Sequence, residues 1–380
     1  MSNFNLISKI NSPDHIYYDL VITNYYSNQD ALQQIEFNET RNSNIVPRAD
    51  EYYLSIVRFQ VDSYSLPVFF ADIEPNQSNI NLMTSSITLS WYDISTSTET
   101  FGTQRYNTWV PNILYQQPKD PTLNPYGIQD ISPYYNSYSF EHVIDIFNTT
   151  LSTAFDDVKS NEPLASKPFF KWNSSELKVE LYCDSVYFDS KATTGGYFNI
   201  YFNRPMFALL NSMPLKFRNR INASNGSIYK LLIYNNNSCN VQTIDNKTYI
   251  KVEQEYSTIS NWTPVTSIVF NTNTLPVVPN QISAPQLQIN GIKISTSNTS
   301  QFSNIITDIA TNEMSYLPNL LYTPSAQYRY IDLQTNTPIK QIDMKVFWRD
   351  KFGVLNPMLF PTGATATMKI LFVKKSSIVL

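Results

Sequence analysis

Apolar and polar residues alternate most regularly near the C-terminal end of the sequence, from Gln341 to Asp350. The apolar positions are Ile342, Met344, Val346 and Trp348, and the polar positions between them include Gln341, Asp343, Lys345 and Arg349. Because successive side chains leave opposite faces of an extended chain, this period of two predicts a half-buried antiparallel strand. Residues 350–353 then predict a tight turn, since Gly353 can take the positive φ that such a turn requires.

Similar but shorter patterns predict strands along most of the sequence. They lie at residues 16–24, 33–37, 52–62, 86–92, 169–172, 176–182, 197–202, 229–234, 248–255, 262–270 and 368–373. In 52–62 we expect Val57, Phe59 and Val61 to share one face. Segments 229–234 and 248–255 are expected to pair as a hairpin. The last strand has apolar residues on both faces, so both are expected to be covered.

Two segments break the strand pattern. Residues 140–158 carry apolar side chains at helical spacing, with Ser139 as a plausible N-cap, and predict one helix that covers a sheet edge or barrel end. A short helical turn is expected at 206–210, after Pro205. Around Gly291 the alternation between Leu287 and Ile294 slips by one residue, which predicts a β-bulge.

Composition supports an all-β chain. Of the 380 residues 14% are aromatic and 15% charged, and there are 8 glycines, well below the usual share. We predict a single jelly-roll β-sandwich or barrel formed by residues 1–100 and 255–380, with an inserted second domain at 101–254 that carries the helix. Low charge and many tyrosines suit a surface buried against partners, but A+T-rich codon usage gives the same bias, so composition leaves both explanations open.

Charge and terminal sequence exclude several classes of protein. The net charge is −4 with no lysine- or arginine-rich run, so no sequence-specific nucleic-acid partner is expected. The first residues lack a signal peptide and no apolar run is long enough to span a membrane, so a protein made in the cytoplasm is expected. The glycosylation sequons at Asn148 and Asn261 are then expected to be chance matches.

Candidate chemistry is sparse. His15 and His142 are the only histidines and stand far apart in sequence, which makes a catalytic or metal site improbable on residue content alone. Cys183 and Cys239 make neither a disulfide framework nor a zinc site. The remaining candidates are the acidic residues Asp156, Asp157, Asp184 and Asp189, and the tyrosine pairs Tyr25–Tyr26 and Tyr134–Tyr135. We predict that the chain is not an enzyme and holds no cofactor or metal; the tyrosine pairs either stack on sugars or are buried.

Several segments, in order, carry a resemblance to a known family. They are Phe37–Arg41, Tyr53–Phe59, Trp262–Phe270, Leu275–Pro276, Tyr322–Pro324 and the run from Tyr328 through Trp348 to Lys375. Together they resemble the penton (vertex) proteins of Sputnik-like virophages and polinton-like viruses. The resemblance is weakest at residues 101–135 and 215–250.

This resemblance implies a structural capsid protein. Homopentamers would close the five-fold vertices of an icosahedral virion, among trimers of a double-jelly-roll major capsid protein, with the insertion facing outward. The family has no catalytic residues to transfer, and the interface residues are not readable from one sequence. The alternative is a jelly-roll glycan- or receptor-binding protein, for which host or giant-virus surface glycans would be the partners.

Overall fold

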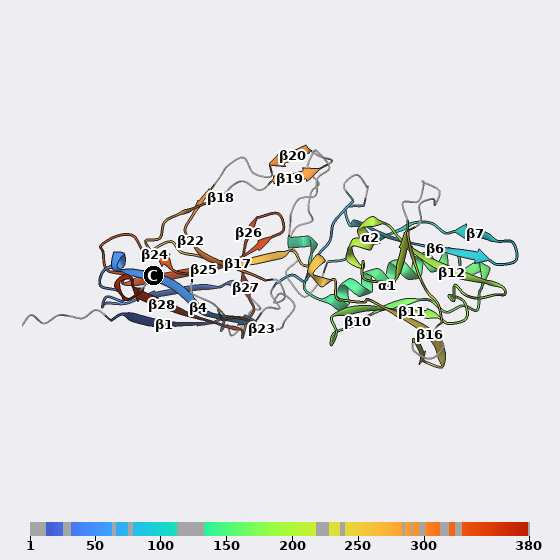
Figure 1. Cartoon of the computed structure of the whole chain (residues 1–380), viewed down its shortest axis with the longest axis horizontal. Coiled ribbons are helices and arrows are strands. Elements are labelled where there is room, and N and C mark those ends of the chain that lie inside the picture. The colour runs from blue at the N-terminus through green and yellow to red at the C-terminus, as the bar shows by residue number, and fades with distance from the viewer. Residues whose placement is uncertain are drawn as a thin grey trace, which may run out of the picture. The chain divides into compact units, whose positions relative to one another are not determined.

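The chain forms two compact units, of which the first is Met1–Leu66 with Val265–Leu380 and the second is Pro67–Pro264 (Figure 1). The computed structural model describes residues 13–25, 32–62, 66–74, 79–111, 133–217, 228–235, 240–282, 286–289, 292–295, 301–311, 319–323 and 329–378. Each unit has its own sheets, so each is described by itself.

The first unit is built from eight main strands in two sheets. In chain order they are β1 (His15–Thr23), β3 (Glu36–Thr40), β4 (Tyr52–Asp62), β17 (Val265–Asn271), β22 (Ile305–Ala310), β23 (Asn319–Tyr322), β25 (Gln341–Asp350) and β28 (Thr365–Lys374). One sheet has the order β1-β28-β4-β23, and the other has β3 and β17 on either side of β25, with β22 next to β17. All these pairings are antiparallel, and this strand order is a jelly roll, as predicted.

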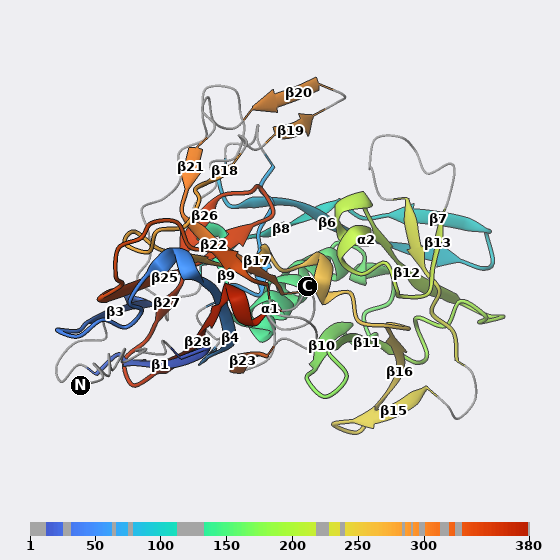
Figure 2. The ribbon, with the colours of Figure 1, turned by 60° about the vertical axis from the view of Figure 1, so that its left-hand side comes forward.

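Shorter strands extend this jelly roll. They are β2 (Gln33–Gln34), β18 (Asn280–Ile282), β19 (Gln286–Ile289), β20 (Ile292–Ser295), β21 (Gln301–Ser303), β24 (Ile331–Asp332), β26 (Leu355–Pro357) and β27 (Leu359–Phe360). Strands β19 and β20 pair antiparallel, with Ile289 opposite Ile292 (Figure 2). The bulge was predicted at Gly291, which lies outside the described residues; the segments on either side of it, β19 and β20, pair with each other.

The hydrophobic core of the first unit lies between its two sheets. The alternating residues Ile342, Met344 and Val346 of β25 are fully buried and Trp348 is nearly so, which confirms the predicted inward face. They belong to one cluster with Met368, Ile370 and Phe372 of β28. The rings of Phe59 and Phe270 meet edge to face at 5.0 Å. The turn after β25 also forms as predicted, with Gly353 at φ +85°.

A β-bulge in β4 changes which residues face the core. Lys369 is opposite Arg58 but Ile370 is opposite Ile56, so Val57 has no partner of its own. Ile56 and Phe59 both point inward, whereas Val57 packs on the outer side against Leu371 and Val373. The prediction that Val57 shares a face with Phe59 is wrong, because the extra residue shifts the alternation. Both faces of β28 are covered, as predicted.

The second unit combines two antiparallel sheets with a helix. One sheet holds β13 (Leu215–Phe217), β14 (Tyr229–Leu231), β12 (Gly196–Phe202), β6 (Leu82–Asp93), β7 (Thr98–Phe101) and β8 (Arg105–Thr108). The other holds β10 (Phe169–Asn173), β11 (Lys178–Asp184), β16 (Lys247–Glu253) and β15 (Val241–Ile244). A small pair, β5 (Phe69–Phe70) and β9 (Asn136–Ser137), completes it. Strands β14 and β16 lie in different sheets, so the predicted hairpin between them is wrong.

Helix α1 (Phe140–Asp156) forms where the sequence predicts it. The Ser139 hydroxyl accepts the backbone N–H of His142 and caps its first turn. The helix packs against β10 of one sheet and β6 and β8 of the other (Figure 1). Phe147 and Phe155 are fully buried there, and Phe155 meets Phe198 at 5.2 Å. The helix therefore lies along the edge strands β10 and β8 of the two sheets, as predicted for a helix that covers a sheet edge, and its other face is exposed. The second helix, α2 (Arg204–Leu209), matches the expected short turn.

The two ends of the second unit are joined to each other. Phe70 donates its N–H to the Trp262 carbonyl at 3.3 Å, and the Thr263 hydroxyl donates to the Pro67 carbonyl at 3.3 Å. Strand β6 pairs with β12, so residues 82–93 pack in this unit although the sequence suggested a division near residue 100. The limits of independently folding domains, expected near 100 and 255, remain a proposal.

Asp343 lies on the polar side of the pattern but is buried. Its carboxylate accepts the Thr272 and Thr274 hydroxyls and the N–H groups of Asn273 and Thr274. Burial alone would raise the pKa of Asp343, but these hydrogen bonds outweigh it and hold the pKa below its usual value. The side chain therefore fixes the chain after β17 to β25.

We expect Phe59→Ala to lower the free energy of unfolding by about 3–5 kcal/mol, the usual loss for a buried phenylalanine. The neighbouring Arg58, on the opposite face and exposed, is the control: Arg58→Ala should stay near the ~0.5 kcal/mol typical of surface changes. Urea unfolding measures both. Equal losses in the two variants would contradict the assigned core face.

Asp343→Asn should destabilise the first unit at neutral pH by about 1–3 kcal/mol, because a charged acceptor is lost from a buried site. Since the folded pKa is lowered, the stabilisation by Asp343 is complete above about pH 4 and is lost as the pH falls through the folded pKa. The difference from the unchanged protein should therefore shrink in acid. Thermal melts between pH 7 and pH 3 measure it, with exposed Asp19→Asn as control; a pH-independent difference would contradict this role.

Candidate functional site

The two histidines do not form a catalytic site. His15 is exposed on β1. The His142 ring nitrogen Nε2 lies 2.5 Å from the Val110 carbonyl, and its ring meets Trp109 edge to face. Within the described ranges no group of three or more His, Cys, Asp or Glu is placed to hold a metal ion. Each described histidine is thus accounted for by ordinary surface or packing contacts.

The candidate acidic residues bind neighbouring groups of the fold. Asp157 forms a two-point contact with Arg105 at 2.6 and 2.8 Å, while Asp156 pairs with Lys167. Asp184 accepts the N–H groups of Ser166 and Val186. Asp189 accepts the N–H of Lys191. Adjacent Asp156 and Asp157 thus point to different partners, as expected for neighbours on a helix.

The structure buries one of the two tyrosine pairs. Tyr134 and Tyr135 are 4% and 0% exposed, and their hydroxyls donate to Asn81 and to the Ile80 carbonyl. They are therefore part of the interior and cannot stack on a sugar. Tyr25 is 86% exposed, and Tyr26 lies outside the described residues.

Cys183 and the sequon asparagines also have structural surroundings. Cys183 is fully buried. Burial, and to a smaller extent the nearby charge of Asp184, raises the pKa of its thiol well above the usual value. The Asn148 amide binds both backbone groups of Phe170 and so ties α1 to β10. Asn261 donates to the Ala208 carbonyl. Cys239 lies outside the described residues.

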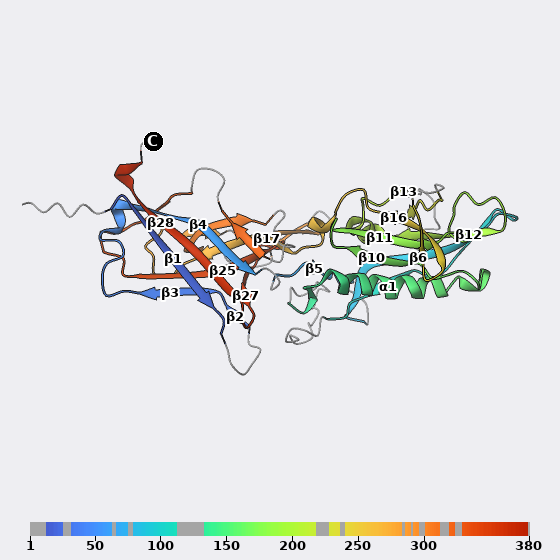
Figure 3. The ribbon, with the colours of Figure 1, turned by 90° about the horizontal axis from the view of Figure 1, so that it is seen from below.

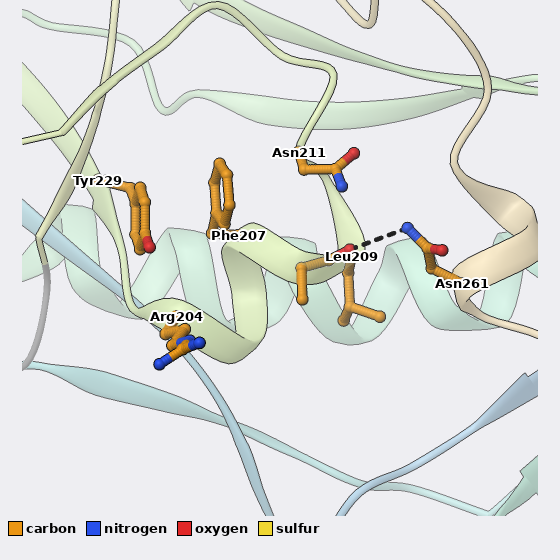
Figure 4. A pocket seen from close by; sticks show the side chains of 7 residues that line it. Arg204, Phe207, Leu209, Asn211, Tyr229 and Asn261 are labelled. Carbon is orange, nitrogen blue, oxygen red and sulfur yellow. Dashed lines mark hydrogen bonds between the residues drawn. The ribbon is translucent and has the colours of Figure 1, made fainter.

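The second unit has a surface pocket lined by polar and aromatic side chains (Figure 4). Its volume is about 400 Å³, and its lining residues are Arg204, Phe207, Ala208, Leu209, Asn211, Tyr229 and Asn261. They come from α2 and the residues that follow it, from the start of β14 and from the short turn Ile259–Asn261.

Local hydrogen bonds fix the pocket wall. The Asn203 side chain accepts the Met206 N–H and caps α2, and Pro205 suits its first turn. The carbonyl of Leu209 accepts the Thr258 hydroxyl at 2.6 Å and the Trp262 indole N–H at 2.8 Å. Carbonyls at the end of a helix have no partner within it, so these bonds hold α2 against the following turn.

Sequence reasoning missed this pocket. Residues 204–211, 229 and 261 carry no motif, and only the fold brings them together. The one available signal was the run Arg204–Pro205–Met206–Phe207, which predicts a capped helical turn but not the aromatic ring of Tyr229 beside it.

A second exposed surface lies on the jelly roll, at the free edge of β1. Tyr17 and Val21 of this edge strand are 56% and 66% exposed, and Tyr25, which follows the strand, is 86% exposed. Figure 3 shows β1 beside β28 and β4. Asp19 between them pairs with Arg58 and Lys369, so this face mixes apolar side chains with a small ion-pair group.

Comparison with known proteins gives the family. The family described as Sputnik minor capsid protein V18/19 matches residues 16–374. The chain belongs to this family. Two Sputnik virophage proteins are similar to parts of it: V18, described as uncharacterized, at 28% identity over 45% of this chain and 99% of V18, and structural protein V19, at 26% identity over 54% of this chain and 94% of V19.

Two solved structures resemble the whole chain. A chain of the Sputnik virophage determined by cryo-EM matches with a TM-score of 0.79 and 25% identity, over 96% of this chain and 99% of that one. The mavirus penton protein matches with a TM-score of 0.61 and 17% identity, over 95% and 100%, which shows a shared fold.

Membership of the V18/19 family makes this chain a structural capsid protein, and hence a component of the virion. The predicted resemblance to virophage penton proteins is confirmed, as is the prediction that the chain is not an enzyme. Among the described residues, neither helix is long and apolar enough to cross a membrane.

Burial of Cys183 predicts that its thiol will not react in the folded protein. A Cys239→Ser variant isolates Cys183, and we expect labelling by Ellman's reagent at pH 8 only after unfolding in urea. The raised pKa keeps the thiol protonated and burial excludes the reagent. A Cys183→Ser variant serves as the reference for the other cysteine. Rapid labelling of folded Cys239→Ser would contradict the assignment.

Proposed function

We propose that this V18/19-family chain is a penton protein whose homopentamers close the five-fold vertices of an icosahedral capsid. The observation that carries the proposal is the shared fold with the mavirus penton protein across both units, over 95% of this chain. The strand order of the first unit supports it, since jelly rolls are a recurrent fold of viral capsid proteins.

A five-fold ring needs a contact between two different surfaces of neighbouring copies. Such a heterologous contact closes when each step turns by one fifth of a circle. The free edge of β1 is suited to be one of these surfaces. Its exposed Tyr17 and Val21 give apolar area, tyrosine is favoured at interfaces, and the outer edge of β1 has no strand partner among the described residues.

The partners follow from this placement. The ring would sit among trimers of a double-jelly-roll major capsid protein, after synthesis in the host cytoplasm. The second unit is then the part we propose to face outward. Proteins at a capsid vertex act by geometry, so the function depends on exposed surfaces and on a rigid core.

The matched pair Val21 and Val186 tests the assembly surface, because these side chains are 66% and 65% exposed in the first and second units. We expect Val21→Arg to abolish pentamers, since a charge would be buried at the contact, and Val186→Arg to leave them intact. Mass photometry and negative-stain imaging of the recombinant chain, alone and with major capsid protein, measure the effect. Circular dichroism checks that both variants fold.

Two results would contradict the proposal. One is stable dimers or trimers of the unchanged chain in both conditions. The other is a particle reconstruction in which density for this chain lies away from the five-fold vertices. Pentamers that tolerate Val21→Arg would keep the vertex assignment but exclude the β1 edge as the contact.

A further inference from the structure

Arg204 in the pocket of the second unit has no carboxylate partner among the described residues. Every other arginine in the described ranges lies within 4 Å of a carboxylate, whereas Arg204 has no such partner among the described residues. The residue is exposed, and no lining residue of the pocket is acidic. A guanidinium with five donors in a planar fork is thus open to a carboxylate from outside.

An aromatic wall stands beside Arg204. The rings of Phe207 and Tyr229 stack almost in parallel, with centroids 3.9 Å apart and planes at 5°. Both are half-buried, and Phe217, which is 54% exposed, meets Tyr229 at 5.7 Å. Stacking on each other fixes the orientation of both rings and turns their outer faces in opposite directions. Figure 4 shows Phe207 between Tyr229 and the two asparagines, so the outer face of Phe207 is the rigid apolar wall of the pocket.

Amide groups line the opposite side of the pocket. Figure 4 shows Asn211 and Asn261 across from Phe207 and Tyr229, with Arg204 near the ring pair. Asn261 is oriented by donating to the Ala208 carbonyl at 3.2 Å, which leaves its amide oxygen able to accept. Asn211 is exposed and adds a further donor and acceptor.

We propose that this pocket binds an acidic monosaccharide unit, a pyranose that carries a carboxylate. The carboxylate would pair with Arg204, the apolar face of the sugar ring would lie on the aromatic wall, and its hydroxyls would bond to Asn211 and Asn261. Such a sugar presents these three kinds of group on one ring, and the volume of about 400 Å³ holds one such ring. An acidic peptide side chain lacks the hydroxyls that the two amides could bind.

This proposal stands apart from the vertex assignment. The pocket lies wholly within the second unit, whereas the proposed assembly edge lies on β1 of the first unit. Binding can therefore be measured on the full chain in whatever oligomeric state it takes. Loss of sugar binding with intact pentamers, or the reverse, distinguishes the two proposals.

The experiment is a titration of the full chain by saturation-transfer difference NMR. The probes are methyl β-D-glucuronide and the methyl α-glycoside of N-acetylneuraminic acid, with methyl β-D-glucoside as the neutral control. We expect at least one acidic probe to bind about tenfold more tightly than the neutral one, because a charge-assisted pair is gained. High salt should weaken this preference.

Variants assign the binding to the pocket. Arg204→Gln should weaken binding of the acidic probe by about tenfold or more. Arg204→Lys should weaken it by less, since lysine keeps the charge but loses the two-point contact of the guanidinium. Phe207→Leu removes the aromatic face that is turned to the pocket and should weaken the binding of acidic and neutral probes alike. Arg48→Gln removes an exposed arginine of the first unit and should change nothing. Thermal melts confirm that each variant folds.

Three outcomes would overturn the proposal. One is equal or absent binding of all three sugars to the unchanged chain. Another is acidic-sugar binding that Arg204→Gln and Arg204→Lys leave unaffected. The third is tighter binding of an acidic peptide, acetyl-Glu-Glu-Glu-amide, than of either acidic sugar, which would assign the pocket to a protein partner.

Discussion

The pairing of β28 between β1 and β4 is the constraint on which the first unit depends. It joins segments far apart in sequence: the hydroxyls of Thr23 and Thr365, 342 residues apart, are 2.9 Å from each other where β1 meets β28. One face of β28 supplies Met368, Ile370 and Phe372 to the core, and the other covers Val57. Without this central strand both faces of the sheet would lose their packing, and β1, which pairs with β28, would have no place in the sheet. Contacts this distant in sequence are costly in loop-closure entropy, so a large buried core must offset them.

The second unit lowers that cost through its own construction. Trp262 packs against Phe69 and Phe147 and donates its indole N–H to the Leu209 carbonyl, so the end of the unit is fixed to its beginning and to its helices. Hydrogen bonds between residues 67–70 and 262–263 join the beginning of the unit to its end. An insertion whose ends meet acts as a short connection between β4 and β17, which is why a jelly roll can accept nearly two hundred residues between two of its strands.

A capsid protein of this kind works through its surfaces. His142, the buried Cys183 and the candidate acidic residues are engaged in packing, hydrogen bonds or ion pairs, His15 is exposed, and the family is a structural one. Among the described residues, the apolar edge of β1 and the pocket around Arg204 are the surfaces whose side chains we propose to bind partners. The β1 edge provides exposed apolar surface, and the pocket provides one positive charge with aromatic and amide neighbours. Area suits a contact repeated between copies, whereas a charged pocket suits a small ligand.

The sequence by itself determined the local elements: the alternation in 341–350, the helix beginning after Ser139 and the turn at Gly353 follow from side-chain spacing, capping and backbone freedom, which act between near neighbours. It also indicated the family. Tertiary structure alone decided the partners of the strands. Alternation cannot show that β14 pairs with β12 and β16 with β15 in different sheets. It also cannot reveal the extra residue at Val57, or show that Asp343 turns inward to bind Thr272 and Thr274. The pocket has the same origin, because Arg204, Tyr229 and Asn261 meet only through packing between distant segments, and the chemistry of such a site depends on distances that no local pattern encodes.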